Sequence, residues 1–329
     1  MNPLGKITAL KKSNKASVPT YLSKVNPLGR IFALKKSGKS DRKSVAEYHS
    51  QESALQDRSY KPHQIDRHLV TYSMPQSFEA EQFKMLRTNL LFPDSGKPPR
   101  SIMITSVVPG EGKSFVAANL AISIAQIISE HVLLIDCDLR TPCIHKRFGF
   151  NDDVPGLSEY LSHGSHFEAI NRKTFGTVPD LNEYLSDEVL LSSLFLKTRI
   201  NKLTLLPGGK PPPNPSELLS SKQMSALLKR EKTRYSNRYI LIDAPPPKLT
   251  TETSVISKQV DGVVLVVKYG KTPRKQVAEV IDILGKERIL GIVTNWADTN
   301  KTYRMYRKHI GKKMNLPRMR EMDIPRMGE

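Results

Sequence analysis

Short, continuous apolar runs alternate with longer segments of helical spacing along the middle of the chain. The runs are rich in β-branched residues and have the length of strands that are covered on both faces. Between them, apolar residues recur every three or four positions, as they do on one face of a helix. This alternation predicts an α/β fold, a mostly parallel and doubly wound sheet with helices on both faces. The expected strands are 101–106, 132–136, 203–206, 239–242, 262–267 and 289–294, and the expected helices are 78–92, 115–129, 216–230 and 273–285.

The two ends of the chain lack this pattern. Residues 1–74 are polar, rich in Ser and Lys and poor in large apolar residues, so we expect them to be disordered or only transiently helical. Within them, the stretch 2–15 (NPLGKITALKKSNK) recurs at 26–39 as NPLGRIFALKKSGK. The sequence therefore predicts this N-terminal segment, one α/β domain over 75–298 and a C-terminal tail over 299–329.

Charge is distributed unevenly along the 329 residues. The chain carries 51 Lys and Arg against 32 Asp and Glu, a formal net charge of +19, and most of the excess lies near the two ends. Basic ends suggest an anionic membrane surface, nucleic acid or an acidic protein face as partner, or simply a solvated tail. The two cysteines form neither a disulfide framework nor a zinc pattern, which fits a reduced cytosolic setting. We expect no transmembrane helix and no secretory signal.

A phosphate-binding loop is predicted between the strand 101–106 and the helix after it. The loop ends as G-x-G-K-S, like the G-x-x-x-x-G-K-[ST] pattern, although Val107 stands where the first glycine belongs. Glycines bring backbone N–H groups close to phosphate oxygens, and a helix N-terminus favours an anion. Lys113 can reach the β- and γ-phosphates, and Ser114 can place its hydroxyl on Mg²⁺. The expected nucleotide-binding residues of the loop are Gly110, Glu111, Gly112, Lys113, Ser114 and Phe115.

Three later strands end in polar side chains that would meet this loop. Asp136 and Asp138 stand at the end of one strand and Asp243 at the end of another. In open α/β sheets, ligands bind at the carboxyl ends of the strands. We expect Asp243 to hold Mg²⁺ through water, as a Walker B carboxylate does. The third strand ends in Asn295, whose amide could pair with a purine edge.

With these residues the chain resembles the bacterial tyrosine kinases, a branch of the MinD-like P-loop ATPases that assists capsular and exopolysaccharide synthesis. The resemblance covers about residues 75–300. General MinD-like ATPases lack the PPNPSELL run, and they carry an early lysine in the loop where this chain has Val108 and Pro109. The motifs that carry the resemblance are PGEGKS at 109–114, LLIDCDLRTP at 133–142, PPNPSELL at 212–219, LIDAPP at 241–246, DGVVLVV at 261–267 and GIVTN at 291–295.

The resemblance implies a protein-tyrosine autokinase that uses ATP and Mg²⁺. Lys113 would bind phosphate and form the catalytic set with Asp136 and Asp138, one of which would accept the proton of the incoming tyrosine hydroxyl. Mg²⁺ would be held by Ser114, Asp136 and Asp243. Adenine would be contacted by Asn295. Because Lys113 would face phosphate, we expect Lys113→Ala to abolish ATP turnover while leaving the folded core intact.

Assembly and modification depart from the family pattern. The oligomerisation helix of the family carries Glu-x-x-Arg-x-x-Arg, which here reads Glu81, Lys84 and Arg87. Lysine lacks the bidentate fork of arginine, so ring assembly is expected to be weaker. The dense tyrosine cluster that ends many members is reduced here to Tyr303 and Tyr306, the candidates for autophosphorylation.

The resemblance also implies partners and a location. The expected partners are a membrane-spanning polysaccharide co-polymerase or activator, further copies of the chain in a ring-like homo-oligomer, and an opposing tyrosine phosphatase. No specific nucleic acid is expected. The chain would be cytoplasmic and peripheral at the inner face of the plasma membrane, held there through its partner.

Two other functions stay open at the level of sequence. The sparse tyrosines favour a MinD-like ATPase that acts as a nucleotide-dependent regulator or scaffold with little kinase activity, whereas the PPNPSELL run favours the kinase. The basic ends would also suit a ParA-like DNA-partitioning ATPase, which should bind DNA in a salt-sensitive manner. Blotting of the purified chain for phosphotyrosine after incubation with Mg²⁺-ATP would separate the first two.

Overall fold

The computed structural model describes residues 65–93, 96–162 and 187–297. Tyr303 and Tyr306, the tail that carries them and the duplicated N-terminal segment lie outside the described residues, so the predictions made for them stay predictions.

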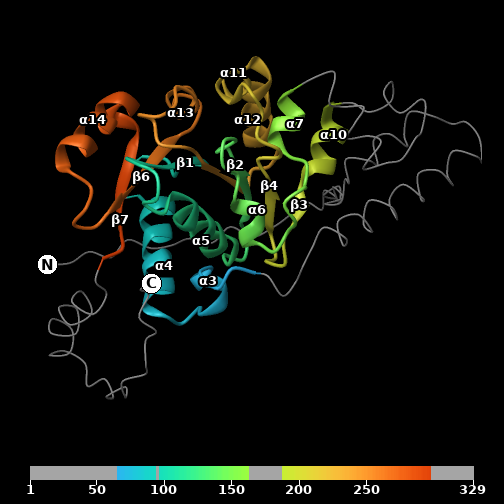
Figure 1. Cartoon of the computed structure of the whole chain (residues 1–329). Coiled ribbons are helices and arrows are strands. Elements are labelled where there is room, and N and C mark those ends of the chain that lie inside the picture. Colours follow the sequence, from blue (N-terminus) through green and yellow to red (C-terminus); the bar gives the residue numbers. More distant parts are fainter. Residues whose placement is uncertain (1–64, 94–95, 163–186, 298–329) are drawn as a thin grey trace, which may run out of the picture. The chain divides into compact units, whose positions relative to one another are not determined.

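A seven-stranded sheet forms the centre of the described part of the chain (Figure 1). The strand order is β3-β4-β2-β5-β1-β6-β7, and every neighbouring pair is parallel except β3 with β4. From β1 the chain first builds β2 to β5 on one side, and it then adds β6 and β7 on the other side, so the sheet is doubly wound. The strands are β1 (Ser101–Ser106), β2 (His131–Asp136), β3 (Leu196–Lys197), β4 (Leu203–Leu206), β5 (Arg238–Asp243), β6 (Gly262–Lys268) and β7 (Ile289–Asn295).

Helices cover both faces of this sheet, which confirms the predicted architecture. On one face, α5 packs directly on the strands and is itself covered by α3 and α4, with α6 beside it. The other face carries the remaining helices, whose apolar residues form a second core. The first layer consists of α3 (Val70–Ser73), α4 (Phe78–Leu91), α5 (Lys113–Ala125) and α6 (Ile144–Arg147). The second consists of α7 (Leu157–Leu161), α10 (Asp187–Leu194), α11 (Pro215–Leu219), α12 (Lys222–Arg234), α13 (Glu252–Ser257) and α14 (Arg274–Leu284).

The two cores follow from the alternation of side chains along each strand. In β2, Val132 and Leu134 join the core under α5, whereas Leu133 and Ile135 join the opposite core. All four are buried, as expected for a parallel strand that is covered on both faces. This double burial explains why the strands read as continuous apolar runs in the sequence.

Some elements differ from the sequence prediction. The helix expected over 216–230 is two helices, α11 and α12, because Ser221 has extended backbone and its hydroxyl caps α12 by accepting from the Met224 N–H at 3.1 Å. The helix expected over 115–129 begins at Lys113 and ends at Ala125. The two-residue strand β3 and the helices α3, α6, α7, α10 and α13 were not predicted.

Residues 65–74, which the sequence prediction assigned to the N-terminal segment, lie against α5. The buried Asn119 side chain on α5 accepts from the N–H and the hydroxyl of Thr71 at 3.0 and 3.1 Å and donates to the His68 carbonyl at 3.0 Å. Asp66 pairs with Arg147 at 2.6 Å. The folded domain therefore begins before the predicted boundary at residue 74, because α5 presents a buried amide that needs these partners.

Candidate active site

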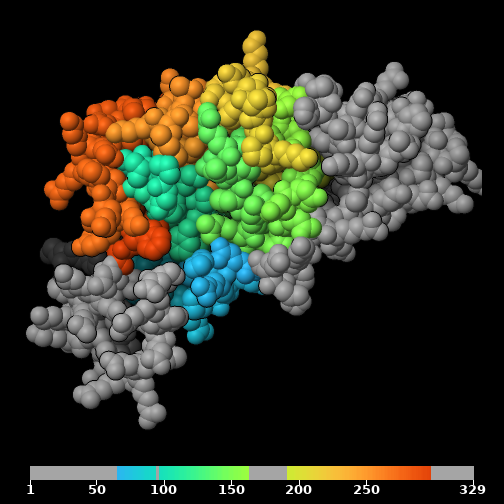
Figure 2. Space-filling view, viewed as in Figure 1, coloured from blue at the N-terminus to red at the C-terminus, as the bar shows by residue number. Residues whose placement is uncertain are grey.

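The predicted phosphate loop connects the central strand β1 to α5. Gly110 and Gly112 have φ angles of 80° and 92°, which glycine adopts without strain. The N–H of Val116 donates to the Gly112 carbonyl, so the amides before it have no partner within the helix and are available to an anion. In the space-filling view, the teal surface of this part of the chain lies between orange surface from the C-terminal strands and helices and green surface from the segment after β2 (Figure 2).

Glu111 holds this loop in place. Its side chain is buried, and one carboxylate oxygen accepts from the backbone N–H groups of Val107 and Val108 at 2.8 and 3.0 Å. The other oxygen accepts from the Lys268 N–H at 3.4 Å and from the Thr272 hydroxyl. The Glu111 carboxylate thus ties the start of the loop to the end of β6. The predicted part of Glu111 in nucleotide binding stays a prediction.

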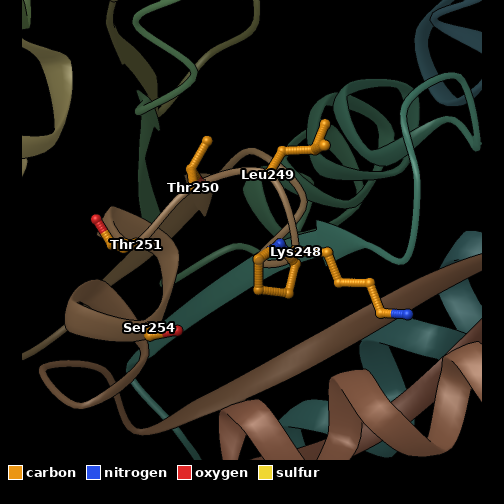
Figure 3. Close-up of a pocket in the computed structure, with 6 residues that line it drawn as sticks. Lys248, Leu249, Thr250, Thr251 and Ser254 are labelled. Atoms are coloured by element: carbon orange, nitrogen blue, oxygen red, sulfur yellow. The ribbon is translucent and has the colours of Figure 1, made fainter.

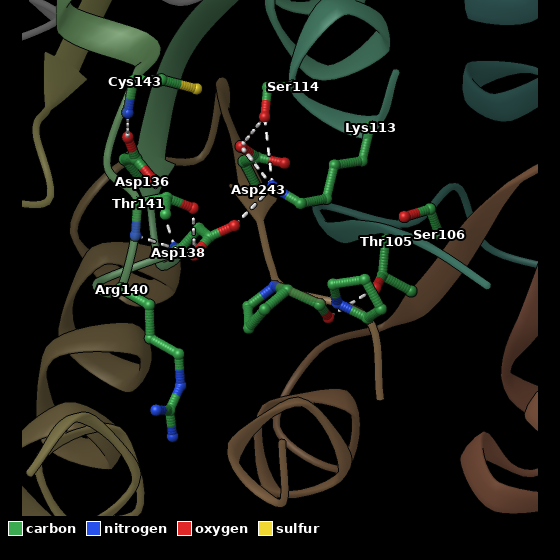
Figure 4. A network of polar contacts seen from close by, with 12 residues as sticks. Thr105, Ser106, Lys113, Ser114, Asp136, Asp138, Arg140, Thr141, Cys143 and Asp243 are labelled. Carbon is green, nitrogen blue, oxygen red and sulfur yellow. Dashed lines mark hydrogen bonds and ion pairs between the residues drawn. The ribbon is translucent and has the colours of Figure 1, made fainter. Parts of the chain in front are cut away.

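Lys113 and Ser114 meet carboxylates from two strands (Figure 4). The Lys113 ammonium lies 2.8 Å from an Asp138 oxygen and 3.5 Å from an Asp243 oxygen. The Ser114 hydroxyl donates to the same Asp243 oxygen at 2.5 Å. The structure therefore brings together four of the residues that the sequence predicted, at the start of α5 and the carboxyl ends of β2 and β5.

Burial and charge set the proton affinities of this cluster. Burial disfavours the charge on Lys113, but the carboxylates of Asp243 and Asp138 outweigh this and raise the Lys113 pKa, so the ammonium persists. Burial raises the pKa of Asp243, although Lys113 and Ser114 oppose it. Lys113 is thus the cation that faces these buried carboxylates. The expectation that Lys113→Ala leaves the folded core intact stays a prediction.

Asp136 lies beside this cluster and binds backbone. One of its oxygens accepts from the N–H groups of Cys143 and Ile144 at 2.9 and 3.0 Å, and the other accepts from the Asp138 N–H at 3.1 Å. Burial, and then the charge of Asp243, raises the pKa of Asp136. Asp136 therefore shapes the loop after β2 and orients Asp138, whose own side chain is the one that reaches Lys113.

The Asn295 side chain also contacts the phosphate loop. Its Nδ2 donates to the Glu111 carbonyl at 2.9 Å, and its Oδ1 accepts from the Trp296 N–H at 2.9 Å. A Cβ atom on Gly112 would lie 2.1 Å from this Nδ2, so a larger residue there would have to displace the Asn295 side chain. The predicted contact of Asn295 with adenine stays a prediction; in the structure its amide supports the loop.

The PPNPSELL run reaches the site through a buried carboxylate. The run forms α11, whose Ser216 hydroxyl donates to Glu252 at 2.6 Å. Glu252 is 1% exposed and its other oxygen lies 3.5 Å from Nε of Arg140, two residues after Asp138. In Figure 4 the Arg140 side chain extends away from Lys113 and Asp243. The run thus helps to position the loop that carries Asp138.

The residues expected in assembly lie on α4. Lys84 pairs with Glu81 at 3.0 Å on the helix surface. Arg87 instead donates to the Ser123 carbonyl of α5 at 2.7 Å. Their role in contacts between copies stays a prediction, with Arg87 already bound within its own chain.

A cavity of about 250 Å³ lies on the segment that joins β5 to α13 (Figure 3). One continuous stretch lines it, including Lys248, Leu249, Thr250, Thr251 and Ser254. Pockets for small molecules usually have about 300–1,000 Å³ and are assembled from several elements. The candidate site is therefore identified by the phosphate loop and its carboxylates, not by this cavity.

A metal bound at this site would depend on more than protein side chains. Residues 65–93, 96–162 and 187–297 contain no group of three or more His, Cys, Asp or Glu side chains arranged to hold a metal by itself. Mg²⁺ commonly needs only one or two carboxylates and completes its shell with water and substrate phosphates. None of the helices within these ranges has the length and apolar character needed to cross a membrane.

Sequence reasoning missed the clamp made by Glu111, the contact of Trp296 with Asn295 and the pair Arg140–Glu252. The clamp made by Glu111 depends on β6, which lies far away in sequence, so no local pattern indicates it. Trp296 directly follows the predicted Asn295 and is the only tryptophan of the chain, a signal that could have drawn attention to it.

Comparison with known proteins agrees with this geometry. The family model of the CobQ/CobB/MinD/ParA nucleotide binding domain matches residues 102–326. The fold and the site thus define a nucleotide-binding protein of this class.

More similar proteins place the chain within one branch of the class. Tyrosine-protein kinase YwqD of Bacillus subtilis is 34% identical over 246 residues, covering 74% of this chain and 92% of the relative. Tyrosine-protein kinase CpsD of Streptococcus agalactiae is 32% identical over 217 residues, covering 65% and 82%. The solved kinase domain of Escherichia coli tyrosine kinase ETK has a TM-score of 0.56 at 28% identity, covering 69% of this chain and 79% of that chain. The chain belongs to the bacterial tyrosine-protein kinases, which confirms the resemblance drawn from its motifs.

Proposed function

We propose that this protein is an ATP-dependent tyrosine autokinase that regulates capsule or exopolysaccharide synthesis. The observation that carries the proposal is the convergence of Lys113 and Ser114 from the phosphate loop on Asp138 and Asp243 from two strands. A phosphate donor bound at the loop would lie beside a carboxylate base. Membership in the tyrosine-protein kinases supports the same reaction.

Each residue has a part in this reaction. The backbone amides of the loop and Lys113 bind the polyphosphate of ATP. Asp138 accepts the proton of a tyrosine hydroxyl, whose pKa of about 10 makes a nearby base useful. The phenol oxygen forms a bond to the γ-phosphorus as the bond from that phosphorus to the β,γ-bridging oxygen breaks, and ADP leaves. Asp136 acts through the backbone by fixing the loop that carries Asp138.

The residues present fit a Mg²⁺ ion. One oxygen of the fully buried Asp243 has no hydrogen-bond partner within the described residues, and the other accepts from Ser114. A buried carboxylate oxygen without a partner is costly unless a cation or water satisfies it. Ser114 and Asp243 would hold the metal, which would neutralise phosphate charge during transfer. Asp136 was also predicted to hold the metal; both of its oxygens accept from backbone N–H groups, so we place the metal on Ser114 and Asp243.

The acceptors and partners follow from the family. We infer that Tyr303 and Tyr306 are the acceptor tyrosines and that a neighbouring copy presents them, with Glu81, Lys84 and Arg87 on the contact surface. A membrane-spanning activator would hold the cytoplasmic chain at the inner face of the plasma membrane. A tyrosine phosphatase would reverse the modification.

One observation favours a second function. Because the tail offers few tyrosines, the protein could act as a nucleotide-dependent regulator or scaffold with little phosphate transfer to protein. Such a protein would hydrolyse ATP and change its assembly state while remaining unmodified on tyrosine.

Phosphotyrosine formation tests the proposal directly. The full chain is incubated with Mg²⁺-ATP, blotted for phosphotyrosine and mapped by mass spectrometry, beside the variants Asp138→Asn and Tyr303→Phe/Tyr306→Phe. Asp138→Asn should abolish the signal and retain ATP binding, and the double tyrosine variant should lose most of it. The matched controls are Asp152→Asn and Tyr269→Phe, both at exposed side chains. ATP hydrolysis without phosphotyrosine would favour the regulator instead.

A further inference from the structure

Trp296 stands at an unusual place beside the phosphate loop. It follows β7 directly and has a φ of 62°, a left-handed conformation that a bulky residue rarely adopts. The residue is 55% exposed. Its ring nitrogen lies 4.0 Å from the point where a Cβ atom on Gly112 would stand, so the indole borders the loop. A strained and exposed aromatic residue next to a ligand loop calls for a functional reason.

Several bonds hold Trp296 there. Its N–H donates to the Asn295 side chain at 2.9 Å, and the Asn295 carbonyl accepts from the Tyr269 N–H at 2.8 Å. The Lys268 ammonium lies 4.6 Å from the centroid of the indole ring, within range of a cation–π contact. The indole is therefore positioned by the carboxyl ends of two strands, β6 and β7.

Asn295 is poorly placed to recognise a base in this arrangement. Its amide already binds the Glu111 carbonyl at one end and the Trp296 N–H at the other. Turning toward a ligand would release the loop from β7. A base bound near this edge would find the exposed indole beside Gly112 of the loop.

We infer that Trp296 is the stacking surface for the purine base of the nucleotide whose phosphates bind the loop. Lys268 covers one face of the ring, and the exposure of the residue leaves the other face for the base. Stacking of an aromatic side chain on a base contributes about 5- to 150-fold in affinity. The inference rests on the proposed nucleotide binding and adds the residue that holds the base.

The single tryptophan makes the test specific, because intrinsic tryptophan fluorescence of the full chain reports on this position alone. The wild type is titrated with Mg²⁺-ATP and with Mg²⁺-tripolyphosphate, which offers the phosphates without a base. Affinities for both are measured by calorimetry for the wild type, Trp296→Ala and Trp296→Phe. Phe92→Ala, which removes another exposed aromatic side chain, is the control.

We expect ATP to change the tryptophan emission and tripolyphosphate to leave it nearly unchanged. Trp296→Ala should weaken ATP binding about 5- to 150-fold and leave tripolyphosphate binding as it was, while Trp296→Phe keeps most of the ATP affinity. Unchanged ATP affinity in Trp296→Ala, or an equal loss for both ligands, would overturn the inference and leave nucleotide binding standing. A wild type that binds neither ligand would overturn both.

Discussion

Replacing Gly112 by Ala would measure how the phosphate loop is joined to β7. Gly112 has a φ of 92°, and a Cβ atom there would lie 2.1 Å from Nδ2 of Asn295. Gly110 has a φ of 80°, and no heavy atom lies within 4 Å of its Cβ position. Gly110→Ala is therefore a matched control: both variants introduce the same kind of backbone strain, and only one adds a collision.

The structure gives the size of each effect. Alanine in the left-handed region costs about 1–2 kcal/mol of stability. In Gly112→Ala the Asn295 side chain must also move, which breaks its two hydrogen bonds, each contributing about 0.5–1.5 kcal/mol. We expect a loss of about 1–2 kcal/mol for Gly110→Ala and about 2–5 kcal/mol for Gly112→Ala.

Urea unfolding of the nucleotide-free chain measures these losses, provided that the slope of free energy against urea is unchanged. A double variant, Gly112→Ala/Asn295→Ala, identifies the cause. Because the same two hydrogen bonds can be lost only once, its loss should be smaller than the two single losses taken together. Equal losses for the two glycine variants, or full additivity in the double variant, would refute the reasoning.

Three further predictions concern buried polar groups, all measured on the full chain. His145 is 2% exposed, and burial lowers its pKa, so the unfolded chain takes up a proton that the folded chain resists. The free energy of unfolding should therefore fall as the pH drops through about 6.5. In urea melts at several pH values, His145→Leu should remove this dependence, whereas the exposed His131→Gln should keep it. Glu231 is 0% exposed and accepts from Arg238 at 2.8 Å, so Glu231→Ala should cost about 3–5 kcal/mol in the same assay, and a loss below about 1 kcal/mol would contradict the pairing. Asn119→Ala should release the segment it holds, seen as faster hydrogen exchange there than in the sheet; unchanged exchange would contradict its role.

The sequence predicted six of the seven strands because each is buried on both faces and reads as an apolar run. It could not predict β3, whose two residues are too few to show a period. The division of the expected helix over 216–230 depends on the backbone and hydroxyl of Ser221, which a broad helical pattern obscures. The place of residues 65–74 depends on Asn119, a polar residue inside an apolar helix that reveals its partners only in three dimensions.

The candidate site was predictable as far as its residues stand at the ends of strands or in the loop. Lys113, Ser114, Asp138 and Asp243 come together because parallel strands place their carboxyl ends at one edge. The particular partner of each side chain could not be predicted. Asp136 and Asp138 look equivalent in the sequence, yet one binds backbone N–H groups and the other an ammonium. Side-chain direction within a turn decides this, and no spacing rule contains it.

The position of Lys113 would couple a bound polyphosphate to the side chain of Asp138. The ammonium lies 2.8 Å from an Asp138 oxygen, so this carboxylate is held in an ion pair in the free protein. A bound polyphosphate carries more negative charge than Asp138 and would draw Lys113 toward it. The ion pair between Lys113 and Asp138 would then be loosened.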